Sequence, residues 1–441
     1  MVPFRGVGAG IGELSWGQAE IWSAMVTQQS SLHIGGVAEF PVPKSLDEIV
    51  AALSWMFGEH QSLRTRLRFD DGVRQVVAEH GEVPLRVVDV DDDADPAKIA
   101  ADIDAEFREV DFDYEHEWPV RLALIRQHGV PTHLVAIYCH LAIDLAGMNA
   151  LFGNGLFALL FTDGGADLPE VDTLEPLAQV AWQRSPAGRR HDKAVQRYWR
   201  RQVAGIPASR FTVPGDEQLP RHWQVTFRSS ALQLALQSIA ARTSAESSTI
   251  LLAAAATALV HVTGRGPAVF QIIVSNRFRP GLADTVSVVS QGGLCVIDVA
   301  VASFDDVIER TARSAMKAYL NAYFDRNAKE TMLDEIGRER GERIELTCFY
   351  NDRRAQDSRI PTGPPPTPKR LAEANAETTI EWGPHADKPW EPLFVNVNDA
   401  GPDVVEILLQ ADTRRFSPDQ MRAFLVTFEA TLMAAAALVR N

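Results

Sequence analysis

The sequence is poor in cysteine, and it has neither a signal-like start nor a long apolar segment. Its three cysteines, Cys139, Cys295 and Cys348, are too few for a disulfide framework and do not have the spacing of metal ligands. Few, scattered thiols are typical of a reducing compartment, so we expect a cytoplasmic location. The longest apolar run, 250–262, is too short to span a bilayer, so we expect no membrane association.

The sequence also has fewer basic than acidic residues. The 43 lysines and arginines face 58 aspartates and glutamates, which gives a net charge of −15. This balance argues against nucleic acid as a partner, because little positive charge is available to neutralise its phosphates. One basic cluster interrupts the pattern between residues 189 and 201. It is either a docking face for an acidic partner or, more simply, the solvated face of a helix.

The length of the chain favours two lobes. At 441 residues, 46% of them hydrophobic, it exceeds one ordinary core and suits two lobes of roughly 200 residues each. A polar helical stretch over 178–202 is followed by Gly205, Pro207 and Pro220. These residues indicate a connection between the two lobes. We therefore divide the chain into an N-terminal lobe (1–180), an interlobe connection (181–220) and a C-terminal lobe (221–441).

Both lobes alternate helical and strand-like patterns, which predicts an α+β fold. Ser15 is placed to cap a helix over 14–28, and Asp70-Asp71-Gly72 is typical of a hairpin turn. Five prolines exclude 359–368 from helix and from sheet interior, so we expect a surface or crossover loop there. The other expected strands are 67–69, 74–78, 87–90, 121–126, 132–138, 223–228, 269–274, 286–299, 343–351, 394–397 and 404–411, and the other expected helices are 45–59, 97–107, one from about 148 to 160, 230–242, 249–263, 305–319 and 418–439.

The most informative segment is 139–145, Cys-His-Leu-Ala-Ile-Asp-Leu, which follows the strand-like run 134–138. His140 can accept a proton near neutral pH, because the unperturbed pKa of histidine lies close to it. Asp144 can hold the loop by an ion pair or by capping the next helix. Alone, a histidine and an aspartate at this spacing are common by chance, so other segments must support the interpretation.

Further segments give that support, because they occur in a familiar order. Together they resemble the condensation domains of nonribosomal peptide synthetases, within the chloramphenicol-acetyltransferase-like acyltransferases. The resemblance covers nearly the whole chain. The matching segments are 14–22, 60–67 (His-Gln-Ser-Leu-Arg-Thr-Arg-Leu), 112–121, 139–145, 251–277 with Asn276-Arg277 at its end, and 412–424 with Phe416-Ser417 inside it.

The resemblance implies a fold and a reaction. It implies two acyltransferase-like lobes in a V, with a central active-site tunnel. An acyl thioester on the phosphopantetheine arm of an acyl or peptidyl carrier protein enters from one side, and an amine or alcohol acceptor from the other. It implies no metal and no dissociable cofactor, since the phosphopantetheine arrives on the partner. We also expect a monomer, working in secondary-metabolite (antibiotic) biosynthesis.

The same resemblance gives roles to three residues. His140 matches the histidine at the centre of catalysis, as a base or an orienting group; the simpler alternative is a buried core histidine. Asp144 matches an architectural aspartate. Arg277 is the candidate to pair with it, and a buried pair of this kind would pin the two lobes' active-site walls together.

Two positions depart from the family motif. Cys139 replaces its first histidine; we interpret Cys139 as a small buried residue, and a catalytic thiol is the alternative, although only the neighbouring His140 could act as its base. Leu145 replaces its glycine, and glycine permits positive φ and close substrate approach. Gly147, two residues later, is the candidate to supply that flexibility.

A third region is changed as well. Gln291 occupies the place of a family asparagine, and Gly292-Gly293 indicates either a β-bulge or a point where a ligand passes close to the backbone. The residues expected along the substrate tunnel are Cys139, Leu145, Gly147, Gln291 and Gly292.

The chain begins just before the first family segment and ends just after the last, so we expect a free-standing condensation-type enzyme that forms an amide or ester. Two alternatives stay open. A degenerate, non-catalytic recruitment module is favoured by Cys139 and Leu145 and opposed by the retained His140 and Asp144. The other alternative is rearrangement of a tethered acyl chain, by epimerisation or cyclisation. A glutamate facing His140 would favour epimerisation; the sequence alone does not place one, and Glu335, Glu339 and Glu345 lie near second-lobe elements in sequence.

Overall fold

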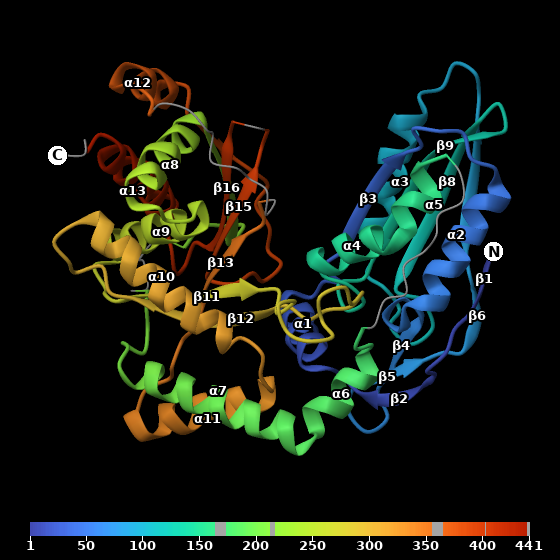
Figure 1. Cartoon of the computed structure of the whole chain (residues 1–441), viewed down its shortest axis with the longest axis horizontal. Helices are drawn as coiled ribbons and strands as arrows, with labels where there is room; N and C mark the ends of the chain where they lie inside the picture. Colours follow the sequence, from blue (N-terminus) through green and yellow to red (C-terminus); the bar gives the residue numbers. More distant parts are fainter. Residues whose placement is uncertain (164–172, 212–216, 355–364, 402, 439–441) are drawn as a thin grey trace. The chain divides into compact units, whose positions relative to one another are not determined.

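The computed structural model describes residues 1–163, 173–211, 217–354, 365–401 and 403–438. They form two compact units (Figure 1). The first contains 1–192 together with 275–291, and the second contains 193–274 and 292–441. This division differs from the expected lobes in two respects. The segment 275–291, expected in the C-terminal lobe, belongs to the first unit, and the expected connection 181–220 is divided between the two units after residue 192.

The first unit is built on a four-stranded sheet in the order β3 (Ile34–Glu39), β9 (Val130–Tyr138), β8 (Val120–Gln127) and β7 (Leu85–Val90). Side chains alternate along β8, so Leu122 and Leu124 pack with α2 (Leu46–Glu59), while Ala123 and Ile125 pack with α3 (Pro96–Glu109) on the other face. Both faces are therefore buried, and β9 delivers the His140 segment from inside this core.

Local sequence signals explain the start of the first unit. Ser15 caps α1 (Trp16–Gln28) in a capping box with Gln18, as predicted. The expected hairpin is confirmed as β4 (Thr65–Arg68) and β5 (Arg74–Val77), with Gly72 at φ +84° in its turn. The remaining elements before β7 are β1 (Val2–Arg5), β2 (Gly10–Glu13), the short helix η1 (Gln61–Arg64) and β6 (His80–Val83).

The second unit contains a mixed seven-stranded sheet. Its order is β12 (Gln291–Ile297), β11 (Ala268–Val274), β13 (Cys348–Asp352), β15 (Leu393–Asp399), β16 (Val405–Asp412), β10 (His222–Ser229) and β14 (Thr379–Trp382). Strand β13 is parallel to both β11 and β15.

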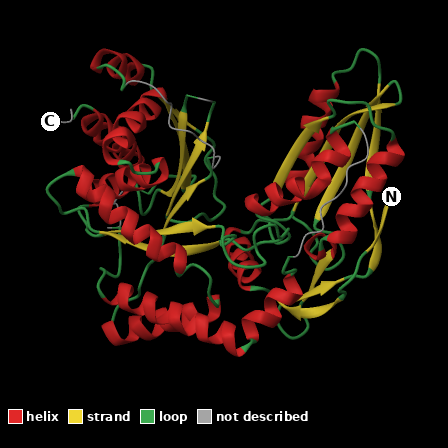
Figure 2. Cartoon of the chain, in the orientation of Figure 1, coloured by secondary structure: helices red, strands yellow, loops and turns green. Residues whose placement is uncertain are grey.

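Helices cover this sheet on two sides (Figure 2). One core cluster joins it to α8 (Ser230–Thr243), α9 (Ser247–Thr263), α10 (Phe304–Leu320) and α13 (Pro418–Ala436). A second cluster joins Val269 and Leu294 to α7 (Pro186–Ala204) and α11 (Arg326–Arg340). Alternation along β11 and β12 places these two clusters on opposite faces.

Several expected elements need correction. The helical stretch 178–202 is two helices, α6 (Pro176–Arg184) and α7, because Pro186 starts the second one. The expected strand 286–299 is confined to β12, and the expected strand 343–351 to β13. Helix α11 was not predicted, nor was α12 (Pro368–Ala376).

The structure describes only part of the expected proline-rich loop, 359–368. Residues 359–364 lie outside the described residues. Pro368 is the first residue of α12, where a helix needs no backbone N–H from that position, so its exclusion from helix was wrong. Within the described part of the chain, no single helix is long and apolar enough to cross a membrane, although α8 and α9 pass that test as a bent pair.

Candidate active site

The His140 segment forms a compact turn between β9 and α4 (Leu145–Leu151). The Cys139 N–H donates to the Pro119 carbonyl at 2.9 Å, and the His140 N–H donates to the Ser31 carbonyl at 3.2 Å. The Ala142 N–H donates back to the Cys139 carbonyl at 3.0 Å. These bonds, all within the first unit, fix the backbone on either side of the imidazole.

The imidazole of His140 has a defined tautomer. Its Nδ1 lies 2.9 Å from the Ile143 carbonyl oxygen, which accepts only, so Nδ1 carries the proton and Nε2 keeps its lone pair. Burial lowers the pKa of His140 below its ordinary value, and the Asp144 carboxylate offsets only part of that effect. The side chain is therefore neutral at neutral pH, with Nε2 as a proton acceptor.

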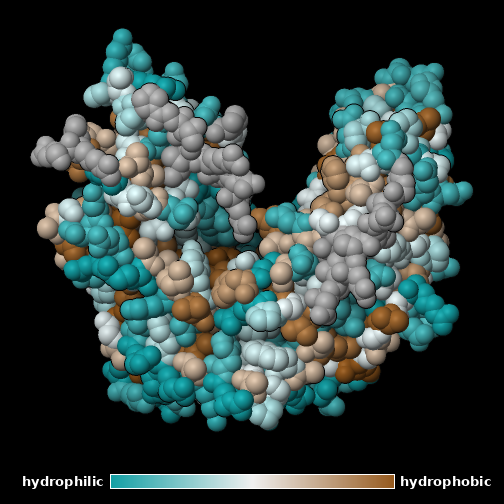
Figure 3. All heavy atoms as spheres, in the orientation of Figure 1, coloured by the Kyte–Doolittle hydropathy of each residue, from teal (hydrophilic) through white to brown (hydrophobic). Residues whose placement is uncertain are grey.

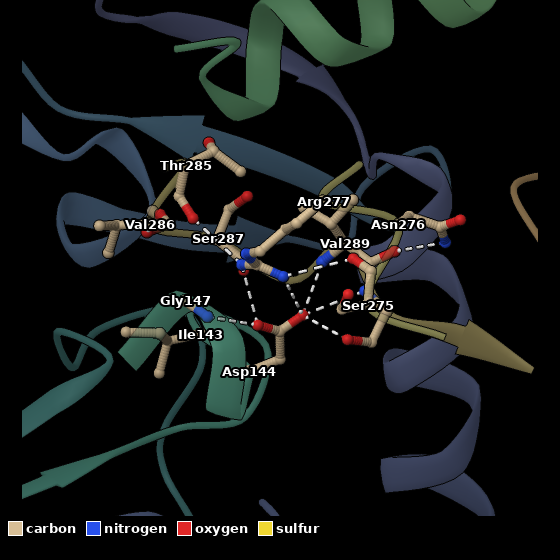
Figure 4. Close-up of polar contacts among 12 residues, drawn as sticks. Ile143, Asp144, Gly147, Ser275, Asn276, Arg277, Thr285, Val286, Ser287 and Val289 are labelled. Carbon is tan, nitrogen blue, oxygen red and sulfur yellow. Dashed lines mark hydrogen bonds and ion pairs between the residues drawn. The ribbon is translucent and has the colours of Figure 1, made fainter. Parts of the chain in front are cut away.

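Asp144 is engaged on both carboxylate oxygens (Figure 4). As the N-cap of α4, it accepts the Gly147 N–H on Oδ1 at 2.7 Å. Its Oδ2 accepts the Val289 N–H at 3.0 Å, the Ser290 N–H at 3.0 Å and the Ser290 hydroxyl at 2.7 Å. This carboxylate therefore has no lone pair to spare for chemistry, which fits an architectural role.

Arg277 completes the arrangement from the segment 275–291. Its Nη2 lies 2.9 Å from Oδ1 of Asp144 and its Nη1 lies 3.1 Å from Oδ2. The same guanidinium donates to the Thr285 and Ser287 carbonyls at 3.1 and 3.0 Å. The predicted ion pair is thus present, with side-chain exposures of 11% for Arg277 and 4% for Asp144.

The location of this pair corrects one part of the prediction. Both partners lie within the first unit, because 275–291 is part of it. The pair therefore anchors a chain segment to the start of α4 instead of joining residues of the two lobes.

The electrostatics of Asp144 follow from these contacts. Burial alone would raise its pKa, but the positive charge of Arg277 and the hydrogen bonds from Val289, Ser290 and Gly147 outweigh burial. The pKa of Asp144 therefore lies below its ordinary value, and the group is a carboxylate at neutral pH.

Cys139 is packed inside the first unit. It is 1% exposed and belongs to an apolar cluster with Met25, Leu67, Phe112 and Leu141. Burial raises the pKa of its thiol to about 12, so the thiolate required for nucleophilic attack is not formed at neutral pH. The geometry supports the interpretation of Cys139 as a small packing residue and disfavours both the catalytic thiol and a tunnel-lining role.

Leu145 and Gly147 occupy the first turn of α4 and differ in exposure. Leu145 is 48% exposed, whereas Gly147 is buried. A Cβ on Gly147 would lie 2.9 Å from the Ser287 carbonyl oxygen and 3.0 Å from Nη2 of Arg277. Gly147 does not have positive φ, so the expectation that it supplies flexibility was wrong: glycine is needed there because Arg277 packs against the helix.

Gln291 and Gly292 stand at the start of β12, where both are buried. A Cβ on Gly292 would lie 3.3 Å from the Gln271 side chain, and one on Gly293 would lie 2.8 Å from the Ala318 carbonyl oxygen. The protein's own atoms therefore account for both glycines, and neither of the expected reasons, a bulge or a ligand's approach, is needed.

The sequence missed the residues that hold Asp144 in place. Ser290 supplies two of its hydrogen bonds, and Gln179 donates to the Ser287 hydroxyl at 3.0 Å. The signal was the run Val286-Ser287-Val288-Val289-Ser290, in which two serines stand among three valines. The run falls within the expected strand 286–299.

The candidate glutamates are all engaged by arginines of the second unit. Glu335 and Glu339 on α11 pair with Arg200, and Glu345 pairs with Arg415 at 3.1 Å.

The basic cluster between residues 189 and 201 lies on α7, whose surface is largely hydrophilic (Figure 3). In the described ranges no group of three or more histidine, cysteine, aspartate or glutamate side chains could hold a metal ion.

Comparisons with known proteins agree with this architecture. The family model described as the condensation domain matches residues 13–328. The nonribosomal peptide synthetase penN of Penicillium thymicola is 26% identical over 331 residues, which is 70% of this chain but 11% of penN. The chain therefore spans about a tenth of the length of that relative.

Solved structures show the same fold. The condensation domain studied for chain release from the enacyloxin polyketide synthase superposes with a TM-score of 0.73 at 18% identity, covering 98% of this chain and 84% of that one. The X-domain from teicoplanin biosynthesis, solved in complex with OxyB, gives a TM-score of 0.68 at 18% identity, covering 98% and 95%. These matches confirm the predicted α+β fold.

Proposed function

Because the chain belongs to the condensation-domain family, we propose that it joins an acyl group, held as a thioester on the phosphopantetheine arm of a carrier protein, to an amine or alcohol. The single observation that carries this proposal is the neutral His140, whose tautomer leaves Nε2 as a proton acceptor. The proposed setting is the biosynthesis of nonribosomal peptides or related metabolites, in which the relatives take part.

The proposed step uses His140 as a proton shuttle. The acceptor nitrogen or oxygen attacks the thioester carbonyl and gives its proton to Nε2 as the new carbon–nitrogen or carbon–oxygen bond forms. The tetrahedral intermediate then collapses, the carbon–sulfur bond breaks, and the departing pantetheine sulfur takes the proton from the imidazolium. The products are an amide or ester and a free thiol.

Asp144 and Arg277 have a positioning role in this proposal. Their ion pair holds the start of α4 against 275–291, and the Ile143 carbonyl that fixes the His140 tautomer directly precedes Asp144. A change at Asp144 is therefore expected to act on catalysis through the orientation of the imidazole.

A recruitment module is the second candidate. It is supported by the half-exposed Leu145 where the family motif has glycine, and by the likeness to an X-domain that was solved in complex with a partner protein, OxyB. In this alternative the fold presents a docking surface and His140 is a remnant.

The experiment that separates the candidates is intact mass spectrometry. The full chain is incubated with acyl-loaded carrier proteins and a pool of amines and alcohols, beside His140→Ala and the matched control His261→Ala at an exposed position of α9. Loss of the acyl group with a new amide or ester, abolished only by His140→Ala, supports condensation. An intact thioester on a carrier that co-elutes with the protein in size-exclusion chromatography supports recruitment. An acyl chain of unchanged mass that, once released, separates from the starting isomer by chiral chromatography supports rearrangement.

A further inference from the structure

Helix α7 carries a row of basic side chains on its outer side. Lys193, Arg197 and Arg201 are exposed and four residues apart, so they follow one side of the helix over about 12 Å. The opposite side, with Val195 and Trp199, is buried in the core cluster that α7 shares with α11 in the second unit. We call Lys193, Arg197 and Arg201 the basic row.

The basic row has no counter-charge within the part of the chain that the structure describes. None of its three side chains forms an ion pair there, whereas Arg200 of the same helix pairs with Glu335 and Glu339 of α11. Like charges four residues apart destabilise a helix. The described contacts of the fold do not offset this repulsion, which favours a role for the row in binding a partner.

The outer side of α7 offers charge without an apolar anchor. None of the large exposed apolar side chains that the structure describes lies between residues 186 and 204. Helices that bind membranes combine basic residues with large apolar ones, so a lipid surface is a poor match. A nucleic acid is a poor match as well, because the chain as a whole carries a charge of −15 and would repel a long polyanion.

The spacing of the basic row matches a helix of opposite charge. Its members follow one another at about 6 Å along the helix axis. Carboxylates four residues apart on a second helix repeat at the same distance, so the two rows can face each other over their whole length. Exposed ion pairs speed association but add little affinity each. Such a surface suits a partner that docks and leaves again.

We propose that the basic row docks an acidic helix of a partner protein. Under the proposed function, on which this identity rests, the partner is the carrier protein that delivers the acyl thioester. The row attracts the acidic helix, and the acidic remainder of the chain disfavours other docking positions. Of the two interpretations that the sequence left open for the basic cluster, this one selects the docking face.

Fluorescence anisotropy with the full chain tests the docking chemistry without turnover. The probe is a labelled, alanine-rich helical peptide with glutamates four residues apart; the same peptide with glutamines and a single-stranded DNA oligonucleotide are its controls. In about 50 mM salt we expect the glutamate peptide to bind with a Kd of about 1 mM or below, roughly tenfold more tightly than the glutamine peptide, and to weaken as salt rises. Equal binding of the two peptides, or tighter binding of the oligonucleotide, overturns the proposal.

Variants locate the docking surface. Arg197→Glu/Arg201→Glu reverses two members of the basic row, and Arg313→Glu/Lys317→Glu reverses two exposed cations with the same spacing on α10. Both double variants change the net charge equally, so a difference between them reports location. We expect the first to weaken the glutamate peptide roughly tenfold and the second less than about twofold. Equal weakening overturns the assignment. If the first variant does not fold, Arg197→Gln/Arg201→Gln replaces it, with roughly threefold weakening expected.

Turnover separates docking from acyl transfer. In the mass-spectrometric assay, Arg197→Glu/Arg201→Glu is expected to slow transfer from carrier-bound thioesters roughly tenfold more than transfer from free acyl-pantetheine, which needs no docking. Equal slowing with both donors overturns the docking role. If the chain transfers no acyl group but the glutamate peptide still binds through the basic row, the proposed function fails and the acidic helix stands as the partner's chemistry.

Discussion

At the scale of single residues, His140 differs from an exposed histidine in its fixed tautomer and its lowered pKa. We predict that the acid limb of the pH profile for single-turnover acyl transfer has its midpoint below pH 6.5, the ordinary pKa of histidine. The sign follows from the mechanism, because the base acts in its neutral form and protonation at low pH removes it. The pH–rate profile with a fixed acceptor checks this, and an apparent pKa at or above 6.5 for the acid limb would contradict it.

The Asp144–Arg277 pair is the second residue-scale feature. Asp144→Asn leaves a buried guanidinium without its counter-charge, so we predict a loss of about 3–5 kcal/mol in the free energy of unfolding, measured in urea. Asp104→Asn is the matched control, because its pair with Arg108 on α3 is partly exposed, and there we predict less than about 1 kcal/mol. Similar losses in both variants would show that the buried pair has no special structural role.

The sequence was informative about single residues wherever a motif carried them. His140, Asp144 and Arg277 were identified by family order, and the ion pair was foreseen. The sequence did not identify the hydrogen-bond partners of Asp144 in 285–290. Asp144 accepts from the backbone N–H groups of Val289 and Ser290, and no side-chain pattern reveals a backbone donor.

At the scale of elements, the packing of α4 against Arg277 depends on Gly147. Gly147→Ala adds a methyl group 2.9 Å from the Ser287 carbonyl oxygen, so we predict a loss of about 1–3 kcal/mol despite the higher helix propensity of alanine. Gly153→Ala, in the next helical turn, η2 (Phe152–Leu156), meets nothing within 4 Å. For this control we predict no change or a gain of up to about 1 kcal/mol in chemical denaturation. Equal effects of the two substitutions would refute the packing argument.

Two errors in the predicted elements have physical reasons. The valine-rich run 286–290 favours a strand, but the N–H groups of Val289 and Ser290 donate to the Asp144 carboxylate, and β12 begins only at Gln291. Helix α11 was missed because only Lys329, Met332 and Ile336 are buried along its 15 residues, which leaves a weak apolar period.

At the scale of the whole molecule, acid sensitivity is expected from His60, which is 6% exposed. Burial, with a smaller effect from Arg64, lowers the pKa of His60 from 6.5 to about 4. As the pH falls, the His60 imidazole is protonated in the unfolded chain before it is protonated in the folded chain. Neutral His60 therefore contributes its full stability above pH 6.5, and about 3 kcal/mol of the free energy of unfolding is lost as the pH falls toward about 4.

The contribution of His60 is measured as a difference. Half-buried Glu175, with its pKa raised to about 7, acts in the opposite direction over the same range, so the wild type is compared with His60→Gln. The stability of the variant, from urea unfolding at each pH, is predicted to fall less steeply between pH 6.5 and 4. Parallel curves for the two proteins would contradict the prediction.

The overall class of the molecule was predictable, and its exact division was not. Alternating helix and strand patterns and the order of family segments were sufficient for the α+β fold. The sequence did not predict that 275–291 belongs to the first unit. That membership depends on contacts between residues far apart in the sequence, such as Arg277 with Asp144 and Gln179 with Ser287.

The central claim is that His140 performs acyl transfer as a neutral base, and the single-turnover rate of His140→Ala tests it most directly. With a carrier and acceptor that the wild-type chain converts, we predict a rate roughly 10²–10⁴-fold lower for the variant. The variant is expected to stay folded, with a loss of roughly 1–2 kcal/mol from the missing hydrogen bond to Ile143. A rate within a few-fold of wild type would contradict the claim and leave the imidazole as a structural remnant of the fold.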